Sequence, residues 1–249
     1  MHCQHPSSVR AGQIARLKQQ IGRLEEGRRV GGDAAPVTTG CGPLDRLLPW
    51  GGLRRGTLVE WLAQGEGAGA ATLAMLAARA AAREGGAVAV LDAKGEFYPP
   101  AAVRLGIEPD QLLVVQTANP TDHAWALDQV LRSPGVAATL AWPEQFGGRL
   151  AGHAFRRLQL AVEQGGGLGL LLRPATVRAE PSWAEVRLLI TPRPCAGTEA
   201  VRRLTVELLR CRAATGGRSV DVEWDDETCT VRLAAPMAYP APHRRAAGA

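Results

Sequence analysis

The central part of the sequence alternates short apolar segments with segments of helical composition, and this alternation limits the possible folds more than any other feature. Apolar segments of strand length occur at Thr57–Leu62, Ala87–Asp92, Gln111–Gln116, Val136–Trp142 and Gly169–Arg173. Helical segments separate them: an alanine-rich one that ends at Gly85-Gly86, then Pro99–Leu105, Thr121–Leu131 and Gly148–Gln164. Repeated strand–helix–strand units predict an α/β fold with a mostly parallel sheet and helices on both faces.

The pattern changes after Glu180, where three or four amphipathic strands replace the alternation. They are expected at Trp183–Thr191, Leu204–Arg212, Ser219–Trp224 and Cys229–Ala234. The last two flank the turn sequence Asp225-Asp226-Glu227 and predict an antiparallel hairpin. We therefore expect antiparallel strands at one edge of a parallel sheet, in a core domain that covers residues 38–235 and precedes a disordered tail at 236–249.

The N-terminal region predicts a separate amphipathic helix within residues 1–26, followed by a linker over residues 27–37. Ile14, Leu17, Ile21 and Leu24 recur three or four residues apart and form a narrow apolar stripe. A short helix of this kind is marginally stable alone and must pack against something. Its partner is either its own domain or a neighbouring protein, and the sequence leaves both open.

Charge and composition narrow the possible functions. The net charge of +5 and the pI near 9.3 permit contact with nucleic acid without requiring it. No apolar run is long enough to span a membrane, and the first residues lack a secretory signal, so we expect a cytoplasmic protein. The five cysteines are widely spaced, which predicts neither disulfides nor a metal site, and we expect no cofactor.

Two longer strings resemble the core of the RecA recombinase family. Thr38–Trp61 is similar to the family's segment before the phosphate-binding loop, with a short Asp-containing helix, a Gly-Gly-Leu turn and a strand ending in a glutamate. Ala89–Gln116 is similar to its strand-Asp-Ala, helix, Arg-Leu-Gly and Asp-x-Leu-Leu series. The order and spacing match over about residues 38–234, and the resemblance implies a RecA-like, P-loop NTPase-type core.

The phosphate loop of this family depends on residues that this chain lacks. A working loop, G-x-x-x-x-G-K-[ST], needs glycines to close around phosphates, a lysine for their charge and a hydroxyl for Mg²⁺. The corresponding string carries Gly65, Gly67, Gly69, Ala70, Ala71 and Thr72, so alanines stand where the lysine and the hydroxyl belong. Trp142 replaces the expected metal-orienting aspartate and Lys94 the expected glutamate. We predict that ATP is not hydrolysed; weak phosphate binding at the helix start stays open.

The family's DNA-binding loops correspond to Pro143–Gly148 and Pro174–Pro181, which are short in this chain. Phe146 could stack on a base, and Arg149, Arg173 and Arg178 could contact phosphates. The alternative is that all four are ordinary loop residues.

A RecA-like core without an ATP site and with short DNA loops is similar to the ImuA family. Glu185–Pro194 and Arg203–Trp224 resemble that family's paired strands. The resemblance implies an adaptor in SOS-induced translesion DNA synthesis, whose partners are a Y-family-like polymerase of the ImuB type and an error-prone C-family polymerase, with RecA as a further possible partner. A SulA-like inhibitor of cell division and a single-stranded DNA-binding RecA paralogue are the alternatives.

Overall fold

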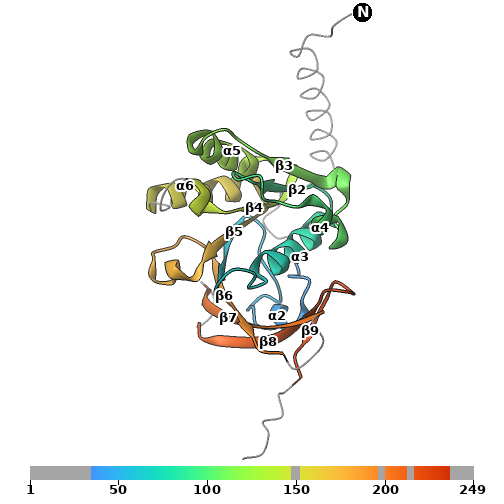
Figure 1. The fold of residues 1–249 in the computed structure, drawn as a ribbon. Coiled ribbons are helices and arrows are strands. Elements are labelled where there is room, and N and C mark those ends of the chain that lie inside the picture. Colours follow the sequence, from blue (N-terminus) through green and yellow to red (C-terminus); the bar gives the residue numbers. More distant parts are fainter. Residues whose placement is uncertain (1–34, 147–151, 196–199, 212–215, 236–249) are drawn as a thin grey trace, which may run out of the picture.

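One nine-stranded sheet organises the protein, with strand order β3-β2-β4-β5-β1-β6-β7-β8-β9 (Figure 1). The computed structural model describes residues 35–146, 152–195, 200–211 and 216–235. The strands are β1 (Thr57–Ala63), β2 (Ala87–Leu91), β3 (Leu112–Val115), β4 (Val136–Ala141), β5 (Leu168–Pro174), β6 (Val186–Arg193), β7 (Val201–Cys211), β8 (Arg218–Asp225) and β9 (Thr230–Leu233). The α-helices are α2 (Gly42–Asp45), α3 (Ala70–Ala82), α4 (Pro99–Arg104), α5 (Pro120–Arg132) and α6 (Gly152–Gly165).

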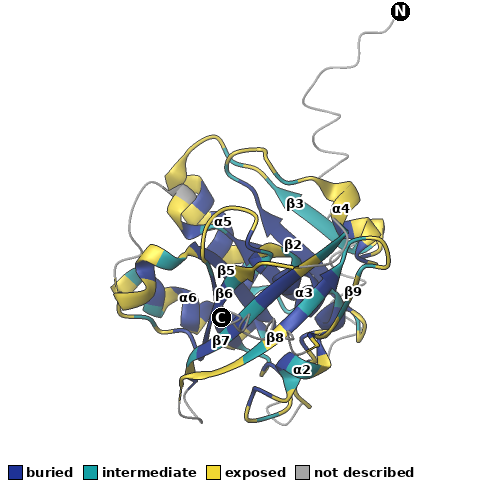
Figure 2. Cartoon of the chain, turned by 60° about the horizontal axis from the view of Figure 1, so that its bottom comes forward, coloured by how far each residue is buried: buried dark blue, intermediate teal, exposed yellow. Residues whose placement is uncertain are grey.

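Strands β1 to β6 pair in parallel, with β3 at one edge of the sheet and the other five inside it. Alternate residues of β1 face opposite cores: Val59 and Trp61 pack in the cluster that contains α3, whereas Leu58 packs with residues of α5 and α6. Helices therefore cover both faces of this part of the sheet (Figure 1). The buried residues are concentrated in the central strands and α3 (Figure 2). The predicted α/β fold is confirmed.

The pairing of β6 to β9 refines the expectation for the C-terminal strands. β6 was expected among the amphipathic strands, but it pairs in parallel with β1, and its first five residues are buried. The strand is buried on both faces because it lies inside the sheet. On its other side β6 pairs antiparallel with β7, and the antiparallel pairing continues from β7 to β8 and from β8 to β9, where the predicted hairpin around Asp225-Asp226-Glu227 joins the last two strands.

The outer face of the antiparallel strands is polar. Arg193 Nε donates to Thr205 Oγ1 at 2.8 Å, and this hydroxyl donates to Asp221 Oδ1 at 2.6 Å. On the next strand pair, Arg232 Nε lies 3.0 Å from Glu223 Oε2. Cross-strand pairs of this kind suit a sheet face that contacts water. This edge of the sheet therefore buries apolar residues on one face only.

Helix α3 begins directly after the loop that follows β1, and its composition explains its central position. Ten of its residues are buried, most of them alanines, so the helix can approach the sheet closely. The chain then turns at Gly85 and Gly86, whose φ angles of +104° and +98° favour glycine. Within the described ranges, no helix is long and apolar enough to cross a membrane.

Candidate functional site

A cleft of about 580 Å³ opens where the parallel strands β1, β4 and β5 end. Most of residues 61–72 line it, together with Lys94 after β2, Trp142 and Glu144 after β4, and Arg173 at the end of β5. Open α/β sheets form ligand sites at the carboxyl ends of their strands. The cleft is therefore the candidate functional site.

The loop between β1 and α3 takes its shape from three glycines. Gly65, Gly67 and Gly69 have φ angles of +91°, +67° and +81°, which side-chain-bearing residues rarely adopt. Gly69 is the residue before α3, and its carbonyl accepts the first helical hydrogen bond, from Leu73 N at 3.1 Å. No side chain caps this helix start. The glycines thus leave the first N–H groups of α3 open towards the cleft.

The side chains at the start of α3 are small and uncharged. Ala70 is buried, Ala71 is exposed and Thr72 is half-buried, and all three line the cleft. The structure also brings Lys94 and Trp142 to the same cleft. The positions that the sequence singled out around the phosphate loop therefore lie together, and the space opposite the helix start is bordered by methyl groups and an indole ring.

Asp92, at the end of β2, is occupied by its own loop. Its carboxylate accepts hydrogen bonds from the backbone N–H groups of Gly95 (2.9 Å), Glu96 (3.1 Å) and Phe97 (3.1 Å), and from Gln116 Nε2 at 3.3 Å. Burial opposes ionisation, but these hydrogen bonds lower the pKa of Asp92 below its ordinary value. Asp92 therefore holds the Lys94 loop in place.

The C-terminal strands contribute residues to the site that sequence reasoning missed. Arg202 of β7 lines the cleft and bonds to Asp226 Oδ1 at 2.6 Å. Leu204, two residues further along β7, contacts the phosphate loop so closely that a Cβ on Gly69 would lie 2.7 Å from its Cδ1. No local signal in the sequence connects residue 202 to a loop more than a hundred residues earlier.

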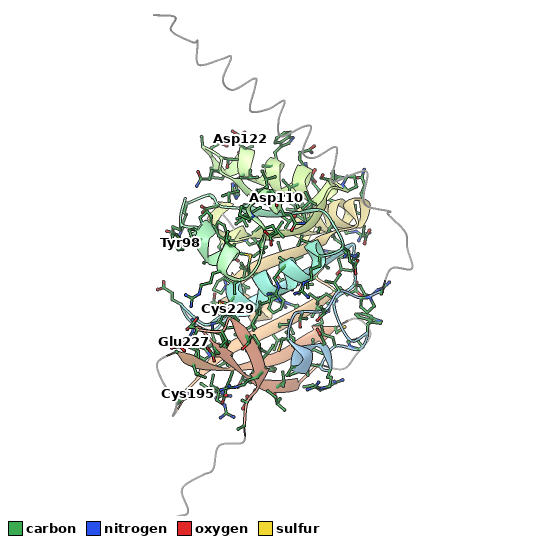
Figure 3. All side chains as sticks on the ribbon, turned by 90° about the vertical axis from the view of Figure 1, so that its right-hand side faces the viewer. Tyr98, Asp110, Asp122, Cys195, Glu227 and Cys229 are labelled. Atoms are coloured by element: carbon green, nitrogen blue, oxygen red, sulfur yellow. The ribbon has the colours of Figure 1, made fainter. Side chains whose placement is uncertain are left out.

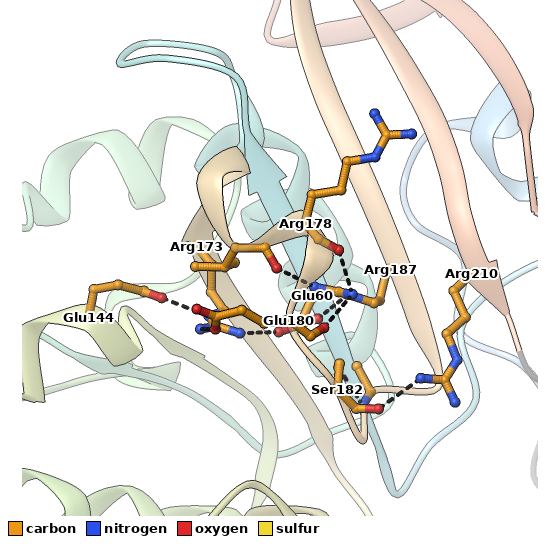
Figure 4. A network of polar contacts seen from close by, with 10 residues as sticks. Glu60, Glu144, Arg173, Arg178, Glu180, Ser182, Arg187 and Arg210 are labelled. Atoms are coloured by element: carbon orange, nitrogen blue, oxygen red, sulfur yellow. Dashed lines mark hydrogen bonds and ion pairs between the residues drawn. The ribbon is translucent and has the colours of Figure 1, made fainter. Parts of the chain in front are cut away.

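The structure corrects the expectation that Arg173 could contact DNA. Its side chain is 2% exposed, and each nitrogen faces a carboxylate: Nη1 lies 2.8 Å from Glu60, Nε 2.7 Å from Glu144, and Nη2 3.0 Å from Glu180 (Figure 4). Burial alone would lower the pKa of Arg173, but its bonds to Glu60 and Glu144 raise the pKa above the ordinary value. A guanidinium held in this way is a structural group and has no nitrogen left for a phosphate.

A second buried arginine completes the network. Arg187 of β6 is the register partner of Glu60 in β1, and its Nε lies 2.5 Å from Glu60 Oε2. Its terminal nitrogens donate to the backbone carbonyls of Val177, Arg178 and Glu180, each at 3.1 Å. These carbonyls belong to or directly follow the 3₁₀ turn η3 (Ala175–Ala179). The segment after β5 is thus fixed to the sheet by side chains.

The remaining candidates are placed as follows. Arg178 is exposed, with 54% of its side chain accessible, and lies 3.1 Å from Glu207. Phe146 ends the 3₁₀ turn η2 (Pro143–Phe146), whose last side chains are not described. Arg149 and the stripe Ile14, Leu17, Ile21, Leu24 lie outside the described residues. Their DNA-binding and partner-binding roles stay predictions.

A smaller pocket of about 330 Å³ adjoins the cleft and shares Ala71, Thr72 and Trp142 with it. Met75 of α3, Phe97 and Leu105 give this pocket an apolar wall. Tyr98 stands at its rim with 68% of the residue exposed (Figure 3). The site therefore has a polar part at the phosphate loop and an apolar part beside α4.

Comparisons with known proteins agree with the fold. The sequence model of the RecA N-terminal domain matches residues 13–140. Protein RecA of Streptomyces venezuelae is 32% identical over 123 residues, which make up 48% of this chain and 32% of that protein. Protein RecA of Clavibacter michiganensis is 34% identical over 126 residues, which make up 49% of this chain and 34% of that protein. Protein RecA of Rickettsia bellii is 29% identical over 129 residues, which make up 51% of this chain and 37% of that protein. The chain thus matches about a third of the length of these relatives.

Proposed function

The chain belongs to the RecA N-terminal domain family, and from this premise we propose that it is a non-catalytic RecA-like accessory protein of damage-induced translesion DNA synthesis. In this role, which the ImuA family exemplifies, it acts by contacts with a Y-family-like polymerase and an error-prone C-family polymerase, and with RecA. Strands β6 to β8 support the ImuA comparison because they contain the two strings that resemble that family, Glu185–Pro194 and Arg203–Trp224.

One observation carries the non-catalytic part of the proposal. The phosphate loop keeps the backbone of a nucleotide site, but the side chains that meet the cleft at the start of α3 are those of Ala70, Ala71 and Thr72. Phosphoryl transfer depends on cations placed around the transferred group and on a carboxylate that orients the metal. Trp142 after β4 can supply neither charge nor metal ligand. The geometry therefore supports a site that does not hydrolyse ATP.

The segment after β5 supports an adaptor in preference to a DNA-wrapping recombinase. Arg187 fixes three backbone carbonyls of residues 177–180, and Arg173 ties Glu180 to the sheet. A surface held in one conformation loses little conformational entropy when a protein partner binds. Binding to single-stranded DNA, in contrast, needs free cations and aromatic platforms, and Arg173 provides no free cation here.

ATP turnover tests the non-catalytic part. We expect phosphate release by the purified protein with Mg²⁺ and single-stranded DNA to equal that of the Ala71→Asp variant, whose added carboxylate faces the loop. Both should equal the buffer blank. Turnover by the wild-type chain that the variant lacks would contradict the proposal.

Direct binding tests the accessory role. The purified chain should form a complex with the purified Y-family-like polymerase of its own organism, and added ATP should leave the dissociation constant unchanged. RecA and the tubulin-like division protein of that organism serve as comparison partners. Binding to the division protein alone would favour the SulA-like alternative.

A further inference from the structure

Two donors on the cleft have no partner within the described part of the chain. Trp61 is completely buried, it is one of the residues that line the cleft, and its indole Nε1 has no acceptor. Lys94 is exposed on the same cleft, and no ion pair to it occurs within the described ranges. A buried N–H without an acceptor is destabilising. An oxygen atom supplied by a ligand would satisfy the indole and pair with the lysine.

The start of α3 adds a third set of donors. The N–H groups of Ala70, Ala71 and Thr72 belong to the first turn of a helix of 13 residues and have no acceptor within that helix. They also carry the positive end of the helix dipole. The indole, the lysine and the helix start therefore favour the same kind of ligand group, an anionic oxygen.

The other charged residues limit how much negative charge the cleft can accept. Arg173 is already bonded to three carboxylates, and Arg202 to Asp226. Glu66 and Glu144 add negative charge to the wall of the cleft, and Asp92, which is bonded to its own loop, and Glu96 add negative charge to the adjoining pocket. The positive charge that can still pair with a ligand is that of Lys94 and the partial charge at the start of α3. A single carboxylate matches this supply, whereas a triphosphate carries several charges and would face the two glutamates.

The neighbouring pocket indicates what accompanies the carboxylate. It joins the cleft at Ala71, Thr72 and Trp142. Met75, Phe97 and Leu105 form an apolar part of its wall, and Asp92 and Glu96 line it as well. Pockets of this kind bind aliphatic or aromatic side chains that anchor a peptide. An acidic residue in the cleft and an apolar residue beside α4 would be neighbours in one extended peptide.

We propose that the cleft binds an acidic residue of a partner protein and that the adjoining pocket binds an apolar residue next to it. This inference rests on the proposed adaptor function and names the site through which the chain holds its partner. The carboxylate accepts hydrogen bonds from the Trp61 indole and the first turn of α3 and pairs with Lys94. The former phosphate loop thus acts as a receptor for a peptide anion.

The test is an NMR titration of the full chain with capped glutamyl-leucine amide, with the glutaminyl counterpart as the neutral control. We expect the glutamyl peptide to shift the Trp61 indole N–H and the amides of Gly67 and Gly69. Lys94→Gln should weaken binding about fivefold, as expected for one partly exposed ion pair. Ala71→Asp should abolish binding, because the new carboxylate repels that of the peptide. It should not destabilise α3, because a negative charge at the start of a helix is favourable. Arg83→Gln removes one exposed positive charge outside the cleft and should bind as the wild type does.

Three results would overturn the inference: no shifts with the glutamyl peptide, equal shifts with the glutaminyl peptide, or tighter binding of inorganic phosphate or metal-free ATP. The last would make the cleft a phosphate site. Partner binding separates this inference from the proposed function. A polymerase that binds Ala71→Asp as tightly as wild type would refute the docking site and leave the adaptor role intact. A wild-type chain that binds the glutamyl peptide but no polymerase would refute the adaptor role and leave the site intact.

Discussion

The loop after β1 and the segment after β5 lie at the same edge of the sheet but are held in place by different means. The loop after β1 takes its shape from the backbone, through Gly65, Gly67 and Gly69, and no side chain caps the helix that follows. The segment after β5 takes its shape from two buried arginines. One loop is thus open to a ligand, whereas the other is closed by its own charges. The two should therefore respond differently to substitution.

The largest effect is expected at the arginine network. Arg173→Met should lower the free energy of unfolding by about 3 kcal/mol, because the buried carboxylate of Glu60 then keeps only Arg187 as a counter-charge and the ion pairs of Arg173 with Glu144 and Glu180 are lost as well. Arg178→Met, in the same segment, removes an exposed partner of Glu207 and should cost less than about 1 kcal/mol. Chemical denaturation of both variants measures the difference. Equal losses would mean that the segment is not held by Arg173.

A smaller effect is expected at the phosphate loop. Gly69→Ala should cost about 2 kcal/mol, because φ is +81° and the new Cβ would meet Leu204 at 2.7 Å. Gly67→Ala is the matched control: its φ is +67° but nothing lies within 4 Å, so about 1 kcal/mol is expected. Denaturation midpoints and the NMR signals of Leu204 follow the two variants. A greater loss for Gly67→Ala would show that the loop does not depend on β7.

Acid should affect a third loop, the one held by Asp92. The pKa of Asp92 in the folded protein lies below its ordinary value of 3.8. Its contribution to stability is therefore complete above pH 3.8 and is lost as the pH falls through the lower folded-state pKa. Asp92→Asn should be less stable than wild type at neutral pH and should lose less stability on acidification. Unfolding curves between neutral and acid pH, with Glu108→Gln as the control, measure this; parallel curves for Asp92→Asn and wild type would contradict the prediction.

The smallest effect is expected from restoring the missing phosphate-loop side chains. Ala70→Lys with Ala71→Thr should increase affinity for ATP, since the glycine backbone is already in place. We expect the double variant still not to hydrolyse ATP, because the residue that follows β4 at the cleft is Trp142, whose side chain offers no ligand for a metal ion. Calorimetry measures the affinity for ATP, and a phosphate-release assay measures hydrolysis. Hydrolysis by this variant would show that the loss of function is confined to the loop.

Much of the fold follows from local patterns in the sequence. Apolar runs of strand length mark β1 to β5, and the glycines of the phosphate loop mark the turn into α3. The orientation of β6 does not follow from such patterns, because its pairing with β1 joins residues more than a hundred positions apart. A run such as Val186–Arg193 has the same composition whether its neighbours are parallel or antiparallel.

The sequence predicts the part of the site that the glycine loop before α3 forms. It does not predict the part that depends on contacts between residues far apart in the chain. Arg173 reads as a loop cation in the sequence, since Glu60 lies 113 residues before it. The three carboxylates around it come from three different segments, and only the folded sheet brings them together. Arg202 was missed for the same reason. Local sequence therefore predicts where the cleft forms, and tertiary contacts decide which charges it contains.

The contact between Leu204 and Gly69 has a practical consequence for anyone dividing this protein into pieces. A fragment that stops before β7 would retain the matched family region but would lack the side chain that supports the phosphate loop and the arginine that borders the cleft. β7 in turn pairs with β8, and β8 with β9. The smallest fragment that retains the site therefore extends to about residue 235, and the last three strands cannot be exchanged as an independent module.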